Sequence, residues 1–186
     1  DGVVYVGTRS NDKVFALLPD KNGDGKSDGV KVIAKGLDTP NGVAYKEGDL
    51  YIAEVSRIFV IRGVDKKLDQ ATTPEPWGPA FPTEGHHGWK FIAFGPDGWL
   101  YVPVGAPCNN CLREPELFAA IHRVSPDGKK RELVAKGVRN TVGFDWHPQT
   151  KRLWFTENGR DWMGDDIPPC ELNELSKPGS HFGYPH

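Results

Sequence analysis

The segment Leu50-Tyr51-Ile52-Ala53-Glu54 decides the fold, because the chain repeats its order of an aliphatic residue, an aromatic residue and a short apolar run. The order returns at Leu100-Tyr101-Val102-Pro103-Val104 and at Leu153-Trp154-Phe155-Thr156-Glu157, and it occurs first at Val3-Val4-Tyr5-Val6. The aromatic residues stand at positions 5, 51, 101 and 154, so the repeat is about 50 residues long. Periods of this length indicate propellers, solenoids or other arrays.

Further strands surround each of these segments. Another expected strand precedes three of the repeated segments across a polar turn, and a further strand follows. Each unit is therefore predicted to consist of β-hairpins. Four antiparallel strands per repeat are typical of a β-propeller blade, and the runner-up, a β-sandwich, does not explain the repeat. The sequence therefore predicts an all-β chain, with residues 1–186 forming one partial propeller domain, truncated at both ends, of three to four blades' worth of strands. The additional expected strands are 41–45, 91–94, 142–146, 13–17, 58–61, 121–124, 30–34 and 131–135.

Composition excludes several other classes. The 186 residues include 22 glycines and 16 prolines, too many helix breakers for a helical bundle, and 20 aromatic residues, too many for a disordered chain. The formal net charge is −2 with both signs interspersed, which predicts no nucleic-acid partner. No apolar run approaches the length of about 20 residues that a transmembrane helix needs, so no membrane insertion is expected.

The three cysteines are Cys108, Cys111 and Cys170. Leucine follows Cys111, so the c-type haem motif is absent, and no second cysteine pair exists for a zinc site. We predict a disulfide between Cys108 and Cys111 that closes a loop in an oxidising compartment. Cys170 would then stay free or pair outside this chain.

A first candidate metal site lies between two expected strands. In the loop at 20–28, oxygen-bearing groups recur at alternate positions, and Gly25 permits the sharp bend that such a loop needs. No glutamate closes the loop and no helix flanks it, so it is not an EF-hand but a structural calcium loop, or else a plain polar turn. The proposed ligands are Asp20, Asn22, Asp24, Asp28 and the carbonyl oxygen of Lys26.

Three further motifs carry candidate chemistry. His86-His87 follows a proline-rich loop at 74–84 and leads into a strand, where His87 could act as a general base or be an ordinary loop histidine. Arg139-Asn140 leads into another strand and suits carboxylate or carbonyl oxygens of a ligand, or a surface salt bridge. Between residues 157 and 171 lie five carboxylates on a glycine-broken loop, which indicates either a second calcium site or surface acidity.

These motifs together resemble the soluble glucose/sorbosone dehydrogenase family. That resemblance implies a six-bladed β-propeller that oxidises aldose or related, sorbosone-like sugars by hydride transfer to pyrroloquinoline quinone (PQQ), assisted by calcium. It also implies a periplasmic or secreted protein. The matching segments are His87-Gly88-Trp89-Lys90, 94–101, Gly137-Val138-Arg139-Asn140, 154–161, Asp165-Asp166, Glu171-Leu172-Asn173 and 181–185.

The same resemblance implies roles for individual residues. His87 would take the proton of the anomeric hydroxyl, and Arg139 would stabilise charge on the quinone, which Asn140 also contacts. The carbonyl oxygens of Gly159 and Arg160 would hold the calcium ion. Acidic residues that support this loop, and complete the metal prediction, are Asp165, Asp166 and Glu171.

Two alternatives stay open. The segments 41–44 and 50–54 are similar to gluconolactonase-type propellers, which predicts a metal-dependent sugar lactonase. A propeller used only for binding would have no activity. The sequence names neither the sugar nor the electron acceptor, because substrate-pocket loops vary freely on a shared fold.

Overall fold

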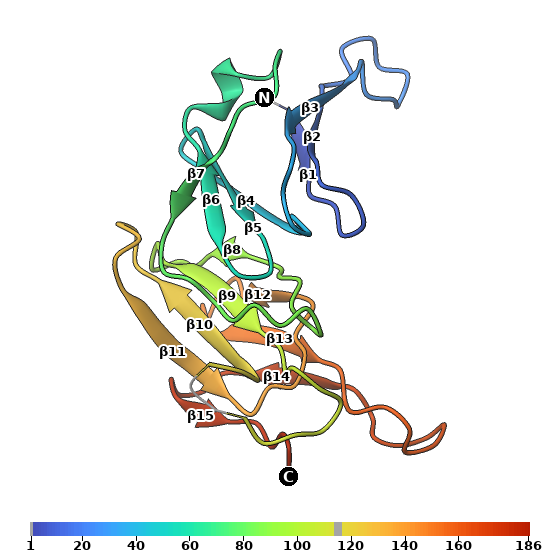
Figure 1. The fold of residues 1–186 in the computed structure, drawn as a ribbon, viewed down its shortest axis with the longest axis vertical. Coiled ribbons are helices and arrows are strands. Elements are labelled where there is room, and N and C mark those ends of the chain that lie inside the picture. Colours follow the sequence, from blue (N-terminus) through green and yellow to red (C-terminus); the bar gives the residue numbers. More distant parts are fainter. Residues whose placement is uncertain (1, 114–116) are drawn as a thin grey trace.

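The computed structural model describes residues 2–113 and 117–186. Those residues form four β-sheets and one short 3-10 turn, η1 (Val64–Lys66). Figure 1 shows the sheets following one another in chain order, from the blue N-terminal sheet to the red C-terminal strands. Among the described residues, no helix is both long and apolar enough to cross a membrane. The prediction of an all-β chain of repeated sheets is confirmed.

Each sheet is an antiparallel meander, and the third sheet gains an extra strand from the end of the chain. That strand, β15, pairs in parallel with β11. The first sheet contains β1 (Val4–Val6), β2 (Val14–Leu17) and β3 (Val30–Ala34); the second contains β4 (Gly42–Lys46), β5 (Asp49–Ala53), β6 (Ile58–Ile61) and β7 (Glu75–Trp77); the third contains β8 (Ala93–Phe94), β9 (Leu100–Val104), β10 (Ala120–Val124), β11 (Arg131–Lys136) and β15 (Ser180–His181); the fourth contains β12 (Phe144–Trp146), β13 (Leu153–Glu157) and β14 (Glu171–Glu174).

Three strands were not predicted. β7 lies inside the segment 74–84, which we expected to be only a loop because of its prolines; that expectation is wrong for residues 75–77. β7 is the outer strand of its sheet, where proline is tolerated because one side of the strand needs no ladder hydrogen bond. β14 and β15 are short and polar, so they carry no apolar alternation that periodicity could detect.

Neighbouring sheets share their cores. Leu50 and Ile52 of β5 pack toward the first sheet, whereas Tyr51 and Ala53 of the same strand pack toward the third. Both faces of the strand are therefore buried, which explains why its apolar residues run continuously instead of alternating with polar ones. A third cluster, which includes Tyr101 and Phe155, joins the third sheet to the fourth.

The register of the sheets is repeated as well. In the second, third and fourth sheets, a leucine at or near the start of the second strand pairs with an aromatic residue of the first strand. The residues seven positions before these aromatic residues are Asp38, His87 and Arg139. We call the segments 38–41, 87–92 and 139–143 the lead-in segments of the second, third and fourth sheets. The pairs are Tyr45–Leu50, Phe94–Leu100 and Trp146–Leu153.

Successive lead-in segments approach each other closely. A methyl group at Gly42 would overlap the carbonyl oxygen of Lys90 in the next lead-in segment. Gly143 occupies the equivalent position 101 residues later, and a methyl group there would meet nothing within 4 Å among the described residues. Glycine at position 42 is therefore required by the distance between two sheets.

Lys90 is the largest fully buried side chain, with 1% of its surface exposed. Its Nζ donates to the carbonyl oxygen of Gly88 at 2.9 Å and lies 5.7 Å from the centre of the Phe81 ring. No ion pair of Lys90 occurs within residues 2–113 and 117–186. Burial consequently lowers the pKa of Lys90 from 10.5 to about 8.

Gly42→Ala should lower the free energy of unfolding by about 1–3 kcal/mol, because the added methyl group forces the second and third sheets apart. Gly143→Ala is the matched control in this chain and should change it by less than about 0.5 kcal/mol. Urea denaturation of both variants would measure the difference. Equal stability of the two variants would contradict the close approach.

Lys90 should make stability pH-dependent at alkaline pH. The folded pKa lies below the unfolded one, so the charged amine destabilises the fold below pH 8 and this penalty disappears as the pH rises toward 10.5. The stability of the wild type relative to Lys90→Met should therefore rise by about 1.4 kcal/mol per pH unit within this window. Denaturation curves of both proteins between pH 7 and pH 11 would test this; a constant difference would refute it.

Candidate functional site

The candidate site lies where a lead-in segment meets the end of a strand of the preceding sheet. The amide of Ala106, just after β9, donates a hydrogen bond to the carbonyl oxygen of Arg139 at 2.8 Å. In the same way, the amide of Thr8, after β1, donates to the carbonyl oxygen of Pro40 at 2.9 Å. A lead-in segment is thus hydrogen-bonded to the preceding sheet as well as to its own. This double attachment brings residues of different sheets to one edge of the arrangement.

Two buried glutamates brace the lead-in segments from within their own sheets. Glu54 accepts a hydrogen bond from the Asp38 amide at 2.7 Å, and Glu157 accepts one from the Arg139 amide, also at 2.7 Å. The equivalent residue of the third sheet is Val104, so His87 is held differently. The second carboxylate oxygen of each glutamate is buried and has no hydrogen-bond partner among the described residues.

His87 is buried and has a left-handed backbone with φ of 51°. Its Nδ1 lies 2.9 Å from the carbonyl oxygen of Ala106, which can only accept, so Nδ1 carries the proton in the neutral ring and Nε2 is the basic nitrogen. Burial lowers the pKa of His87, and the Ala106 carbonyl partly opposes this shift. His87 is therefore neutral over a wider range of acidic pH than an exposed histidine.

The Arg139 guanidinium is buried, and all five of its N–H donors are directed at oxygen atoms. Nε donates to the Asn109 carbonyl oxygen at 2.9 Å, and Nη1 donates to the carbonyl oxygens of Asn158 (3.1 Å) and Gly159 (2.8 Å). Nη2 donates to Asn109 Oδ1 at 2.9 Å and to Asp161 Oδ2 at 3.0 Å. Arg139 thus joins the loop after β9 to the loop after β13.

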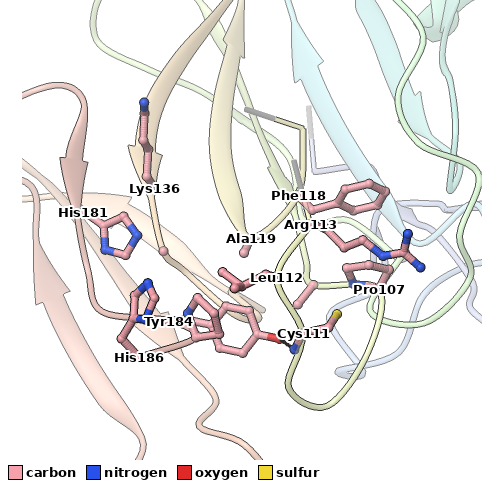
Figure 2. A pocket seen from close by; sticks show the side chains of 13 residues that line it. Pro107, Cys111, Leu112, Arg113, Phe118, Ala119, Lys136, His181, Tyr184 and His186 are labelled. Atoms are coloured by element: carbon pink, nitrogen blue, oxygen red, sulfur yellow. Dashed lines mark hydrogen bonds between the residues drawn. The ribbon is translucent and has the colours of Figure 1, made fainter. Parts of the chain in front are cut away.

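Asn109 is the site residue that sequence analysis missed. It lies between Cys108 and Cys111, which form the predicted disulfide, whereas Cys170 is exposed and unpaired in the described part of the chain. The Tyr184 hydroxyl accepts a hydrogen bond from the Cys111 amide at 2.9 Å, as Figure 2 shows. The sequence carries one signal for Asn109, its position between two cysteines predicted to form a disulfide. That position restricts the Asn109 backbone but does not identify Arg139 as its partner.

A cavity of about 200 Å³ adjoins Arg139. Gly159, Arg160 and Glu171 from the predicted metal set line it, together with Glu157. Burial raises the pKa of Glu157 to about 7, with a further contribution from the nearby Glu171 carboxylate. The cavity therefore combines carbonyl and carboxylate oxygens with two guanidinium groups.

A second cavity, of about 310 Å³, lies beside the disulfide loop (Figure 2). Cys111, Leu112 and Tyr184 line it beside Lys136 and His181. One cysteine of the disulfide, Cys111, therefore forms part of a cavity wall.

Other predicted site residues lie elsewhere. The 20–28 loop connects β2 to β3, and its side chains accept hydrogen bonds from its own backbone: Asp20 from Gly23 and Gly25, and Asp24 from Lys26. Asp165 and Asp166 are exposed, and Asn140 accepts through its backbone oxygen from the Asn158 amide at 3.0 Å. Within the described ranges, no group of three or more His, Cys, Asp or Glu is close enough to hold a metal.

Several solved structures share this fold. The PQQ domain of pyranose dehydrogenase from Coprinopsis cinerea, in its holo form, is 15% identical with a TM-score of 0.78, matching 99% of this chain and 53% of that one. PQQ-bound aldose sugar dehydrogenase from Streptomyces coelicolor is 23% identical with a TM-score of 0.74, matching 98% of this chain and 59% of that one. The calcium structure of a family AA12 carbohydrate-active enzyme from Trichoderma reesei is 18% identical with a TM-score of 0.74, over 99% and 55% of the two chains.

These likenesses establish the propeller-type fold. The chain spans little more than half the length of each of these three proteins. An uncharacterised protein of Borreliella burgdorferi (strain ATCC 35210) is 32% identical over 196 residues, a match that covers all of this chain and 49% of that protein. The chain thus spans about half the length of that curated relative. Because residues 5–177 match a family known as a domain of unknown function, DUF7133, the chain belongs to the DUF7133 family.

Proposed function

We propose that the protein containing this chain is an oxidoreductase that oxidises an aldose or related sugar with PQQ and calcium. The observation that carries the proposal is the attachment of His87 and Arg139 to the same residue: the Ala106 carbonyl oxygen contacts the His87 ring, and the Ala106 amide binds the Arg139 carbonyl oxygen. The two residues are thereby fastened to one segment where the loops of adjacent sheets converge, and the Arg139 charge is close enough to contribute to the lowered pKa of His87. The fold shared with PQQ-bound sugar dehydrogenases supports the choice of reaction.

His87 would act as the general base of this reaction. Its Nδ1 is used by Ala106, which fixes the ring plane and leaves Nε2 to take the proton of the sugar hydroxyl. The close approach of Gly105 to both His87 and the Arg139 backbone excludes a side chain between them. The protein's own contribution is therefore a pre-oriented base beside a fixed positive charge.

The cavity at Arg139 fits the implied cofactor and metal in its donor chemistry. The unpartnered Glu157 oxygen, the Glu171 carboxylate and the Gly159 carbonyl are the hard oxygen ligands that calcium takes. Arg160 suits the oxygens of an anionic cofactor, to which Arg139, with its five N–H donors used within the protein, would contribute its charge. When bound, PQQ would accept the hydride and calcium would act as a Lewis acid. Asn140, on the same lead-in segment, would complete the contacts.

Two remaining predictions are part of this proposal. A disulfide persists in oxidising environments, so the Cys108–Cys111 bond supports a periplasmic or secreted location. The loop with Asp20, Asn22, Asp24, Lys26 and Asp28 would bind a calcium ion that only stabilises β2 and β3. The carboxylate and carbonyl oxygens of the cavity at Arg139 would bind a second calcium ion, which serves the reaction. Asp165 and Asp166 would support the loop at 157–171 that carries this second site.

The proposal predicts cofactor-dependent sugar oxidation. The full-length protein, reconstituted with PQQ and calcium, should bleach a redox dye in the presence of an aldose, and removal of calcium with a chelator should abolish this. His87→Ala should lower kcat/KM by about 10²–10⁴-fold, because the general base is lost. His147→Ala, in the turn between β12 and β13, is the control and should leave the rate unchanged.

Acidification of a sugar lactone without PQQ would instead establish the lactonase alternative. Inactivity in both assays, together with unaltered PQQ binding by His87→Ala, would favour a binding propeller. Either result would overturn the proposed dehydrogenase.

The pH profile tests the role of His87 independently. Because burial lowers the pKa of His87, the acid limb of kcat/KM should fall at a pH below the ordinary 6.5. Steady-state rates between pH 4 and pH 8 would locate this limb. A limb at or above 6.5 would argue against His87 as the base.

A further inference from the structure

The loop closed by the Cys108–Cys111 disulfide holds Asn109 against the candidate site. The two cysteines are half-buried, and four residues from Cys108 to Cys111 complete the ring. So short a ring leaves the Asn109 backbone few conformations, because both of its flanks are covalently tied. Asn109 is also half-buried and faces Arg139 and Asp161.

Asn109 uses both its backbone and its side chain in these contacts. Its carbonyl oxygen accepts from Arg139 Nε at 2.9 Å, and its Oδ1 accepts from Arg139 Nη2 at 2.9 Å. The same Oδ1 accepts from the Asp161 amide at 2.8 Å, and Nδ2 donates to the Asp161 carbonyl oxygen at 3.2 Å. The guanidinium is thus oriented from two directions by one residue, in a fork geometry that lysine could not use.

The opposite side of the loop is fastened as well. The Tyr184 hydroxyl accepts from the Cys111 amide at 2.9 Å (Figure 2). It also lies 3.5 Å from the Asn109 carbonyl oxygen. The segment just before the loop, Gly105–Ala106, supports His87. One continuous segment, 105–111, therefore contacts both predicted catalytic residues.

We infer that Asn109 is a positioning residue for the Arg139 guanidinium and the Asp161 loop, and that the Cys108–Cys111 disulfide holds Asn109 in place. The consequence for catalysis rests on the proposed function, but the positioning itself does not. Asn109 orients Arg139 before any ligand arrives, and the disulfide limits the loop movement that would release it.

Hydrogen–deuterium exchange of the ligand-free, full-length protein tests the positioning. Asn109→Ala should speed exchange of the Asp161 amide about tenfold, because the acceptor Oδ1 is lost. Asn109→Asp retains an acceptor oxygen and should restore slow exchange. Exchange in β5 should stay unchanged in both variants, which separates a local effect from general unfolding.

The disulfide is tested with dithiothreitol, which gives two electrons and two protons to the Sγ–Sγ bond, leaves two thiols and becomes a cyclic disulfide. Reduction should speed Asp161 exchange about as much as Asn109→Ala does. The double variant Cys108→Ser/Cys111→Ser should show the fast exchange without reductant and no response to it. Cys170→Ser, which removes the exposed free thiol, should respond as the wild type does.

Slow Asp161 exchange in Asn109→Ala or in the reduced protein would overturn the inference, whatever the enzymatic activity. Fast exchange in both, with no dye reduction by any form, would support the positioning and refute only the proposed function. If the protein is active, Asn109→Ala should lower kcat more than it raises KM, and Asn109→Asp should recover most of the loss. Equal activity of wild type and Asn109→Ala would contradict the catalytic consequence.

Discussion

The hydrogen bond from the Ala106 amide to the Arg139 carbonyl oxygen is the contact on which the candidate site depends. It fastens the backbone of the fourth sheet to the end of β9 in the third, and it does so without a side chain. Backbone contacts of this kind require close approach, which is why Gly105 has no room for a Cβ beside His87. The apolar cores that neighbouring sheets share set the distance between the sheets, and this hydrogen bond sets the distance between their backbones at the site.

Much of the fold followed from local patterns. The repeated aliphatic–aromatic segments, such as 50–54 and 153–157, predicted a strand in each sheet, and the signal is strongest in β5 and β9, which are buried on both faces. The spacing of Cys108 and Cys111 predicted the disulfide. Strand β7 was missed because its prolines are tolerated only at a sheet edge, and edge position depends on tertiary structure.

The site was predictable only in part. Sequence motifs selected His87 and Arg139, to which the resemblance gave roles, whereas Gly159 was selected by the resemblance alone. The structure places Arg139 and Gly159 in contact and links Arg139 to His87 through Ala106. The contacts of Asn109 with Arg139 span 30 residues, and those of Glu157 span 18, so no local pattern contains them. Both are hydrogen bonds to groups whose positions depend on how the sheets pack.

The paired braces, Glu54 with Asp38 and Glu157 with Arg139, separate architecture from chemistry. Each glutamate binds a backbone amide, so it is indifferent to the side chain that the braced residue carries. One copy of the brace presents an aspartate and the other an arginine. Because the glutamate binds the braced residue through its backbone amide, a single substitution at the braced position can reverse the charge that it presents and still leave the glutamate–amide hydrogen bond in place.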